Sequence, residues 1–391
     1  MKIVVVGTHS SQKTGYARVM KGLVPRLGDV AVYGVQSCGP SEFADGVEFD
    51  AREFGDDNGF AFGGLRKFVE THAAEAVILY NDPVVIGQYL GALEGVETRV
   101  YLYADLVNTR ISERHWPTFR HPLVAGVMAF SECWKREILG IPGFAKPVVV
   151  ATHAVEVPIV PNARIPGCGD DVVFLNMNRN TKRKRLDVYA TAAARFLAKN
   201  PDAPARFLAN SHHEEAFDLH SIALRELVAC GVPLDRAVTL AGRVMVNRSV
   251  LSDETVNFLH NACDVAVNCS EGEGFGLCAA EAASVGKPVI VSGVGGALDL
   301  FSPASPTAPA PAWVIPPVAE YFVDGRDGIG GCAELISVDD LVSAFAAFML
   351  LENRKMYGDR ARVHMASRPT WGDIADTIRS FVAHALVAHA R

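Results

Sequence analysis

Two glutamates, Glu273 and Glu281, stand eight positions apart in a glycine-rich stretch that runs from Ser270 to Gly296. The pattern predicts a glycine-rich turn that opens an alanine-rich helix, followed by a short apolar strand at 288–292. With Glu273 at the helix entrance and Glu281 two turns further on, the carboxylates would lie roughly 12 Å apart along the axis. That spacing is comparable to the distance between the sugar and the ribose of a nucleotide sugar.

The residues between the two glutamates could bind oxygen atoms through their main chain. Phe275, Gly276 and Leu277 would place backbone N–H groups at the positive end of the predicted helix, which suits phosphate or sugar oxygens. Two solvated glutamates on a surface helix would carry no such meaning, but here glycines, a phenylalanine and a strand accompany them. One helix could therefore hold both ends of a diphosphate-linked donor.

The sequence EGFGLCAAEAASVGKPVI, which begins at Glu273 and is followed by GVGG, resembles the signature of retaining glycosyltransferases of family 4. The resemblance implies an α/β protein with the GT-B fold, in which two Rossmann-like parallel-sheet domains face each other across a cleft. It also implies a hexosyltransferase that uses a nucleotide diphosphate sugar and needs no metal or other cofactor. Glu281 would hold the ribose hydroxyls, and Glu273 would hold hydroxyls of the transferred sugar with the N–H groups of Phe275 to Leu277.

A basic cluster follows the predicted strand at 171–177. Such clusters are commonly solvated faces, but a loop that leaves the carboxyl end of a strand borders the ligand crevice of a doubly wound sheet. The resembled family has an arginine and an Arg-Lys pair here, which match Arg179 and Arg183-Lys184, with Lys184 as the phosphate lysine. These cations would offset the charge that develops on the leaving diphosphate.

The first half of the chain opens with an apolar run at 2–6, which predicts a buried parallel strand. Gly7 and Gly15 flank the loop that follows, so the GxGxxG pattern of nicotinamide-binding proteins is missing and a dehydrogenase is disfavoured. The resemblance makes Gly15 a candidate contact to the donor, while a plain helix-start glycine is the alternative.

After the predicted strand at 98–104, family members commonly carry a histidine that reaches the transferred sugar, whereas this chain has Asp105. Asp105 could accept a hydrogen bond from a hydroxyl or a cationic group, or could simply cap a turn. Arg243 and Val244 occupy the family's base-contacting position if 238–242 is a strand that leads toward the crevice.

The length of 391 residues indicates two domains. Prolines and glycines at 158–170 mark a linker, so we expect an acceptor-side domain at 1–160 and a nucleotide-sugar domain at 170–371. In the GT-B fold the last helix, at about 372–391, would cross back to the first domain. The formal net charge of −7 does not suggest a nucleic-acid partner.

Eight cysteines without a CxxC pair indicate reduced thiols, and no apolar run approaches the length of a membrane-spanning helix. We therefore expect a cytoplasmic protein, with a peripheral membrane association left open. The acceptor could be a glycan, a membrane-surface lipid or another hydroxyl compound, and the oligomeric state stays open. Two alternatives share the donor site: a GT-B nucleotide-sugar epimerase and a nucleotide-sugar-binding protein that has lost catalysis.

Overall fold

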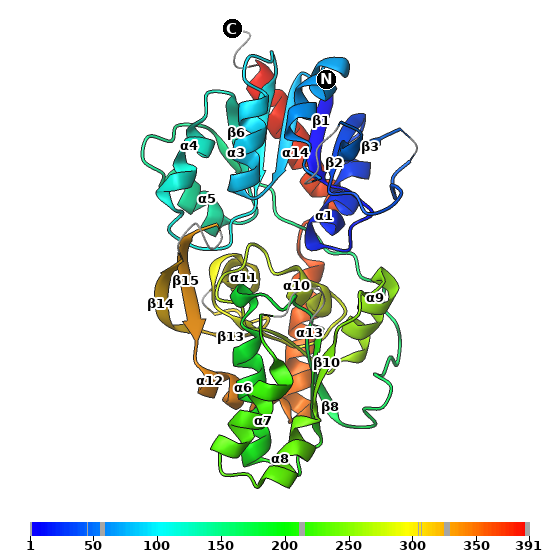
Figure 1. The fold of residues 1–391 in the computed structure, drawn as a ribbon, viewed down its shortest axis with the longest axis vertical. Coiled ribbons are helices and arrows are strands. Elements are labelled where there is room, and N and C mark those ends of the chain that lie inside the picture. The colour runs from blue at the N-terminus through cyan, green and yellow to red at the C-terminus, as the bar shows by residue number, and fades with distance from the viewer. Residues whose placement is uncertain are drawn as a thin grey trace. The chain divides into compact units, whose positions relative to one another are not determined.

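The computed structural model shows two compact units, each built on a parallel sheet (Figure 1). It describes residues 2–44, 46–54, 59–210, 216–303, 305, 307–323 and 329–387. The first unit comprises Met1–Ala154, Phe322–Cys332 and Pro369–Arg391, and the second comprises Val155–Tyr321 and Ala333–Arg368. Residues 155–160, which we expected in the first domain, belong to the second unit, and the segment 322–332 belongs to the first.

The first unit contains a seven-stranded sheet in the order β3-β2-β1-β4-β5-β6-β7, and all of its strand pairs are parallel. The central strands are apolar and buried along their whole length, as expected when helices cover both faces. The strands are β1 (Ile3–Thr8), β2 (Val30–Val35), β3 (Glu48–Asp50), β4 (Ala76–Asn81), β5 (Arg99–Ala104), β6 (Val124–Ala129) and β7 (Val148–Val150).

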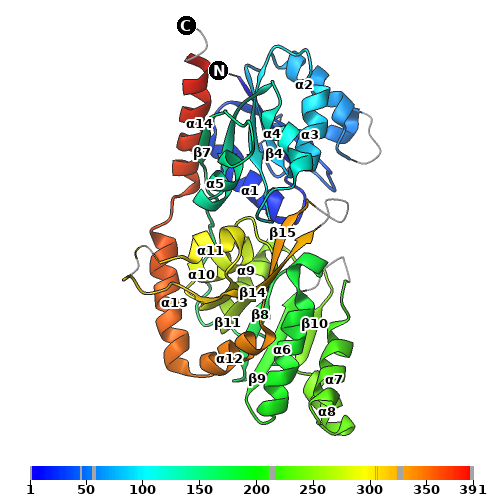
Figure 2. The ribbon, with the colours of Figure 1, turned by 90° about the vertical axis from the view of Figure 1, so that its left-hand side faces the viewer.

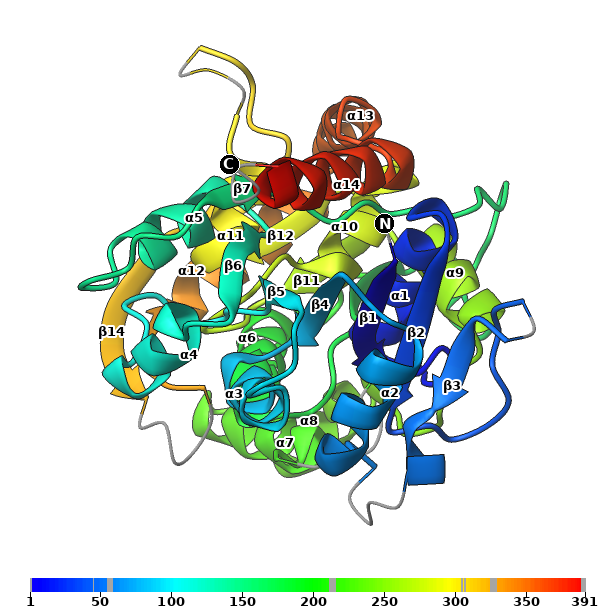
Figure 3. The same ribbon diagram turned by 90° about the horizontal axis from the view of Figure 1, so that it is seen from above.

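Helices cover this sheet on both sides, with α3 and α4 on one face and α14 on the other (Figure 3). Polar side chains fix where several helices begin: Thr14, Asp82 and Ser131 each accept a hydrogen bond from a backbone N–H of the first turn. The helices are α1 (Gly15–Leu23), α2 (Leu65–Thr71), α3 (Pro83–Ala92), α4 (Trp116–Arg120), α5 (Glu132–Leu139) and α14 (Trp371–Val387), with 3₁₀ turns η1 (Val24–Arg26), η2 (Ala51–Phe54), η3 (Phe62–Gly64) and η4 (Glu113–His115).

The C-terminal helix α14 packs on the elements of the first unit (Figure 2). Trp371, its first residue, is buried against Gly22 of α1, where an added Cβ would stand 2.3 Å from the indole. Tyr101 of β5 donates a hydrogen bond to the carbonyl of Val382 at 3.2 Å. One face of α14, from Trp371 to Val382, is thus part of the first unit's core.

The second unit contains a six-stranded sheet in the order β10-β9-β8-β11-β12-β13, and its strand pairs are also parallel. Its core on one face is a cluster of aromatic rings from Phe174, Phe207 and Phe345. The strands are β8 (Val172–Asn176), β9 (Ala205–Asn210), β10 (Val244–Asn247), β11 (Val265–Asn268), β12 (Val289–Ser292) and β13 (Trp313–Ile315).

Eight α-helices and a 3₁₀ turn lie in the described part of the second unit, and a strand pair adjoins them. The helices are α6 (Leu186–Lys199), α7 (Leu219–Ala229), α8 (Leu234–Ala241), α9 (Asp253–Ala262), α10 (Leu277–Ser284), α11 (Gly295–Phe301), α12 (Val338–Phe348) and α13 (Leu351–Ala366), and the turn is η5 (Lys182–Lys184). The strand pair consists of β14 (Pro317–Val323) and β15 (Gly331–Ile336).

One predicted element is wrong: residues 238–242 end the helix α8 and do not form a strand. Ala237, Leu240 and Ala241 are the buried residues of this helix, and their spacing of three and four positions is that of a helix face. The strand itself begins two residues after the predicted one ends, at Val244. The short run VTLA fits the period of a strand as well as that of a helix, so the sequence alone does not distinguish the two. In the structure the strand that pairs with β9 begins only at Val244.

Candidate functional site

The second sheet has a single point at which its strand order reverses, between β8 and β11. In open parallel sheets ligands bind outside the carboxyl ends of the strands at such a point. Asn176 ends β8 and Asn268 ends β11, so the loops 177–185 and 269–276 both leave the sheet there. The predicted basic cluster and the predicted glycine-rich turn are these two loops.

The structure joins the two loops through a buried ion pair between Lys184 and Glu273. The Lys184 Nζ atom donates to Glu273 Oε2 at 2.5 Å, and Glu273 is only 7% exposed. Asn268 Nδ2 and Ser270 Oγ donate to the same carboxylate oxygen at 3.2 Å each. Arg183 reaches Oε1 of this carboxylate at 3.9 Å and donates to the Gly272 carbonyl at 2.5 Å. The carboxylate is therefore held in one place by three donors and a second cation.

The charges of this pair shift each other's protonation. Burial alone would raise the pKa of Glu273, but the Lys184 and Arg183 charges and the hydrogen bonds outweigh it and lower the pKa to about 2. For Lys184, burial lowers the pKa more than Glu273 raises it, and Arg183 adds to the lowering. Glu273 is consequently ionised across the physiological range and can accept hydrogen bonds but cannot act as a proton donor.

Glu281 lies on α10, five residues into the helix, and is 6% exposed. Its Oε2 atom lies 3.1 Å from His260 Nε2 on the neighbouring helix α9. Glu273 is not at the entrance of the same helix, because α10 begins at Leu277. The expected 12 Å spacing assumed a single helix, and that assumption does not hold, because residues 273–276 precede α10 and the helical rise does not apply to them.

Gly276 makes the corner between this turn and α10. Its φ of +95° lies in the left-handed region, which glycine adopts without strain, and no side chain caps the helix. Phe275 before it is buried, and Leu277 after it is partly exposed. The three residues predicted to offer N–H groups thus lie where the first turn of α10 begins, as the sequence pattern indicated.

Sequence reasoning missed Arg185, Glu271 and Tyr321, which brace the same loops. Arg185 has φ +49° and ψ +46°, a left-handed conformation that costs a non-glycine residue free energy. Its guanidinium binds both oxygens of Asp187, at 2.9 and 2.8 Å, and Glu271 at 3.3 Å. Glu271 also accepts a hydrogen bond from the Tyr321 hydroxyl of β14 at 2.8 Å. Of these three residues, only Glu271, an acidic residue two positions before Glu273, could have been suspected from the sequence.

Arg179, predicted beside the donor phosphates, lies three residues after β8 at the same edge of the sheet and is exposed. Arg243 and Val244 do not lie at this edge, because they stand at the amino end of β10 and not at its carboxyl end. The Arg243 guanidinium instead donates to the Ala203 carbonyl at 2.8 Å. The prediction that Arg243 and Val244 contact the nucleotide base is therefore corrected. The residue at the carboxyl end of β10 is Asn247.

Gly15 and Asp105 belong to the first unit. Gly15 is the exposed first residue of α1, and the Asp105 amide donates to the Asn81 carbonyl at 2.9 Å. The Tyr16 hydroxyl hydrogen-bonds to the Asp105 carboxylate, and its pKa is well above the ordinary value because of burial first and the Asp105 charge second. Tyr16, which sequence reasoning missed, thus contacts the aspartate that directly follows β5.

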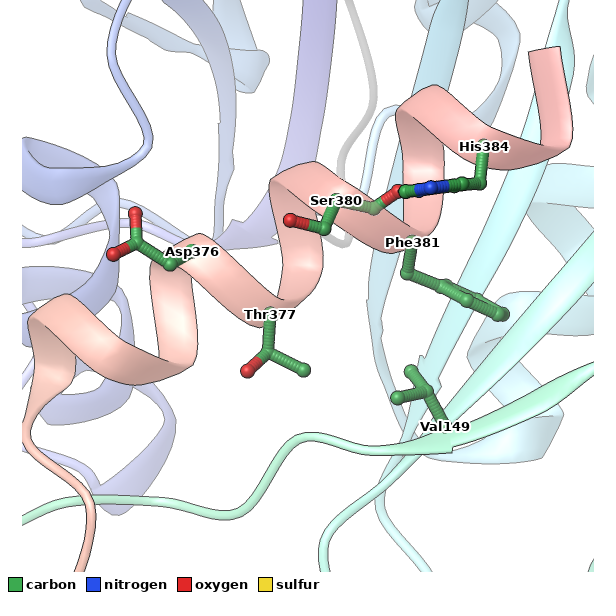
Figure 4. A pocket seen from close by; sticks show the side chains of 6 residues that line it. All are labelled: Val149, Asp376, Thr377, Ser380, Phe381 and His384. Atoms are coloured by element: carbon green, nitrogen blue, oxygen red, sulfur yellow. The ribbon is translucent and has the colours of Figure 1, made fainter. Parts of the chain in front are cut away.

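A surface cavity of about 480 Å³ lies on the first unit along α14 (Figure 4). Val149 and Phe381 line it together with polar side chains of the helix, and none of the predicted site residues does. Within the described residues, no three His, Cys, Asp or Glu side chains form a group that could hold a metal ion, and no helix is long and apolar enough to cross a membrane. All eight cysteines are free.

Comparisons with known proteins agree with the fold. Residues 170–346 match the family Glycosyl transferases group 1, so the Lys184–Glu273 pair and Glu281 lie within a segment similar to glycosyltransferases. No curated protein is significantly similar to the chain in sequence.

Several solved structures are similar over nearly the whole chain. Sucrose-phosphate synthase from Thermosynechococcus elongatus matches with a TM-score of 0.70 and 15% identity, over 99% of this chain and 100% of that one. HepE from Anabaena, in complex with UDP-glucose, matches with a TM-score of 0.69 and 14% identity, over 98% of this chain and 100% of that one. A UDP-forming α,α-trehalose-phosphate synthase from Burkholderia xenovorans, in complex with glucose-6-phosphate, matches with a TM-score of 0.65 and 13% identity, over 98% of this chain and 99% of that one. The chain has the GT-B fold, and the fold expectation is confirmed.

The Glu273→Gln variant tests whether the buried carboxylate is ionised. Its folded-state pKa lies below the unfolded value of about 4.3, so the stabilisation is complete above that value and is lost as the pH falls toward 2. At pH 7 we expect Glu273→Gln to be less stable by about 3 kcal/mol, since it leaves Lys184 buried without a counter-charge. At pH 2 the two proteins should unfold alike in urea.

Glu226→Gln is the matched control, because Glu226 pairs with Arg195 in a more exposed place in the same unit. An exposed pair contributes at most about 1 kcal/mol, so this variant should stay close to the wild type at every pH. If the difference in unfolding free energy between Glu273→Gln and the wild type does not change with pH, Glu273 is not an ionised partner of Lys184.

Arg185→Ala and Arg185→Gly separate backbone strain from ion pairing. Both remove the bonds to Asp187 and Glu271, but only glycine relieves the left-handed conformation. Arg185→Gly should therefore be more stable than Arg185→Ala by roughly 1 kcal/mol in urea unfolding. At Arg183, which does not have a positive φ, alanine should be the more stable of the two. The same order at both positions would contradict the strain argument.

Proposed function

We propose that this protein is a retaining glycosyltransferase that transfers a hexose-type sugar from a nucleotide diphosphate sugar to a hydroxyl acceptor without a metal. The observation that carries this proposal is the buried Lys184–Glu273 pair at the point where the second sheet's strand order reverses. It adjoins the helix that carries Glu281, within the segment similar to glycosyltransferases.

The nucleotide and the phosphates of the donor would be bound mainly by residues of the second unit. The Glu281 carboxylate has two acceptor oxygens, which match the two hydroxyls of a ribose. The backbone at the start of α10, at Phe275 to Leu277, would lie toward the sugar and the phosphates, where the helix dipole favours negative charge. HepE was solved with UDP-glucose, so a UDP-sugar is the first donor to test.

The leaving diphosphate would be stabilised by Lys184 together with Arg179. The Lys184 side chain is only 13% exposed, so its charge acts on a phosphate with little screening by water. With donor bound, its ammonium would lie between the Glu273 carboxylate and the phosphate. Because the pKa of Glu273 is about 2, this residue would accept hydrogen bonds from sugar hydroxyls and would not exchange protons. The proton of the acceptor hydroxyl would pass to an oxygen of the leaving phosphate.

The acceptor side would use the first unit. Asp105, with Tyr16 bonded to it, offers a carboxylate at the carboxyl edge of that sheet, next to the end of β5. We propose that it accepts a hydrogen bond from a hydroxyl of the transferred sugar in place of the family's histidine. Gly15, exposed at the start of α1, remains a candidate donor contact. The acceptor would be a glycan, a membrane-surface lipid or another hydroxyl compound.

A nucleotide-sugar-binding protein without catalysis is the second candidate. The aspartate at position 105 favours it, because a carboxylate cannot donate to a sugar hydroxyl as a histidine can. The presence of the whole set Glu273, Glu281, Arg179 and Lys184 argues against it.

The donor class is tested by calorimetry and thermal unfolding with UDP, GDP, ADP and their sugars in the presence of EDTA. A ligand at 100 times its Kd stabilises the folded state by about 2.7 kcal/mol, which raises the unfolding midpoint measurably. We expect one diphosphate to bind selectively without a metal. Folded protein that binds none of them would overturn the donor assignment.

Lys184→Ala should lower the turnover of the selected donor by about 10²- to 10³-fold, the effect of removing one preorganised charge from a transition state. Lys182→Ala is its matched control, because Lys182 belongs to the same 3₁₀ turn but is exposed. Sugar transfer and nucleotide release are measured together with and without acceptors. Donor binding with no turnover across a panel of sugar and lipid acceptors would support the binding protein instead.

A further inference from the structure

His260, in the last turn of α9, is buried against the carboxylate of Glu281. Its side chain is 1% exposed, and its Nε2 atom lies 3.1 Å from Glu281 Oε2, which belongs to a residue 6% exposed. The contact is therefore shielded from water, where a hydrogen bond to a charged group is strong.

The direction of this hydrogen bond follows from its partners. Of the two ring nitrogens, Nε2 faces a Glu281 carboxylate oxygen, which accepts a hydrogen bond when it is ionised. His260 Nδ1 is buried and has no hydrogen-bond partner among the described residues. A hydrogen on Nδ1 would be buried without an acceptor, so the imidazole carries its hydrogen on Nε2. The ring thus points a single donor at Glu281.

The helix end that carries His260 is fixed by its neighbours. Asn261 donates to the Pro158 carbonyl at 3.0 Å and accepts from the Val160 amide at 2.9 Å, so the chain before the second sheet ties down the last turn of α9. Cys263, just after the helix, donates to the His260 carbonyl at 3.5 Å. These contacts fix the position of the backbone that carries the imidazole.

Free glutamate side chains rotate about several bonds, and ordering one on binding costs entropy. A carboxylate has about four lone-pair directions, so a hydrogen bond from one donor does not exhaust what it can accept. We propose that His260 is a positioning residue for Glu281, and that it thereby makes the site selective for ribonucleoside over 2′-deoxyribonucleoside diphosphates. This inference rests on the proposed function, in which Glu281 binds the ribose.

The experiment measures the affinities of UDP, GDP and ADP and of their 2′-deoxy counterparts by calorimetry. In the wild type we expect the bound ribonucleotide to bind about tenfold or more tightly than its 2′-deoxy form, the effect of losing a hydrogen bond to a charged group. In His260→Phe, which keeps the ring's size but lacks the donor, this ratio should fall to about twofold or less.

Rescue by a conservative variant separates positioning from packing. In His260→Gln the amide nitrogen extends to about the place of Nε2, so the ratio should return toward the wild-type value. Should the phenylalanine variant not fold, His260→Asn takes its place with the same expectation, because its shorter amide does not reach Glu281. In a Glu281→Gln background, His260→Phe should change the ratio no further, since the histidine acts through the carboxylate.

His364→Phe is the matched control, because this histidine of the same unit also has a ring nitrogen bonded to an oxygen, the carbonyl of Leu300. It should lower stability without changing the ratio of affinities. A His260→Phe protein that binds and keeps the wild-type ratio would overturn the inference, as would a wild type that binds both nucleotide forms equally. A wild type that binds no nucleotide at all would instead overturn the proposed function.

Discussion

The buried ion pair between Lys184 and Glu273 is the interaction on which the arrangement of the second unit's site depends. Its two members come from the loops that leave β8 and β11, so the pair fastens together the two strands between which the sheet order reverses. A buried charge without a partner is costly, and each member therefore requires the other. This requirement fixes a cation and an anion side by side at the edge of the sheet where a parallel fold binds its ligands.

Further charged groups surround this pair in the same loops, and each is satisfied by a neighbour. Arg185 holds a strained backbone by binding Asp187 and Glu271, and Glu271 in turn accepts from Tyr321. His260 holds Glu281 from a separate helix. The site is thus built before any ligand arrives, and a preorganised arrangement of charges is what stabilises a transition state without further reorganisation. In the first unit, Tyr16 hydrogen-bonds to the carboxylate of Asp105.

The elements of the fold could be predicted from the sequence where one period dominated. The strands predicted at 98–104, 171–177 and 288–292 are present as β5, β8 and β12, with bounds that differ by at most one residue. A strand was expected at 238–242 because its three apolar residues fit either period, whereas in the structure the strand that pairs with β9 begins only at Val244. The helix α13, on which few residues are buried, and the strands β14 and β15 gave no periodic signal that could be read.

The sequence by itself determined which residues could do chemistry, because Glu273, Glu281 and Lys184 lie in a pattern of glycines and strands that resembles a known signature. Only the tertiary structure decided which of them touch. Lys184 and Glu273 are 89 positions apart, and Glu281 meets a histidine 21 positions before it. Sequence periodicity describes neighbours within one element, whereas these contacts depend on the order of strands in the sheet and on burial, which determine which charges need each other.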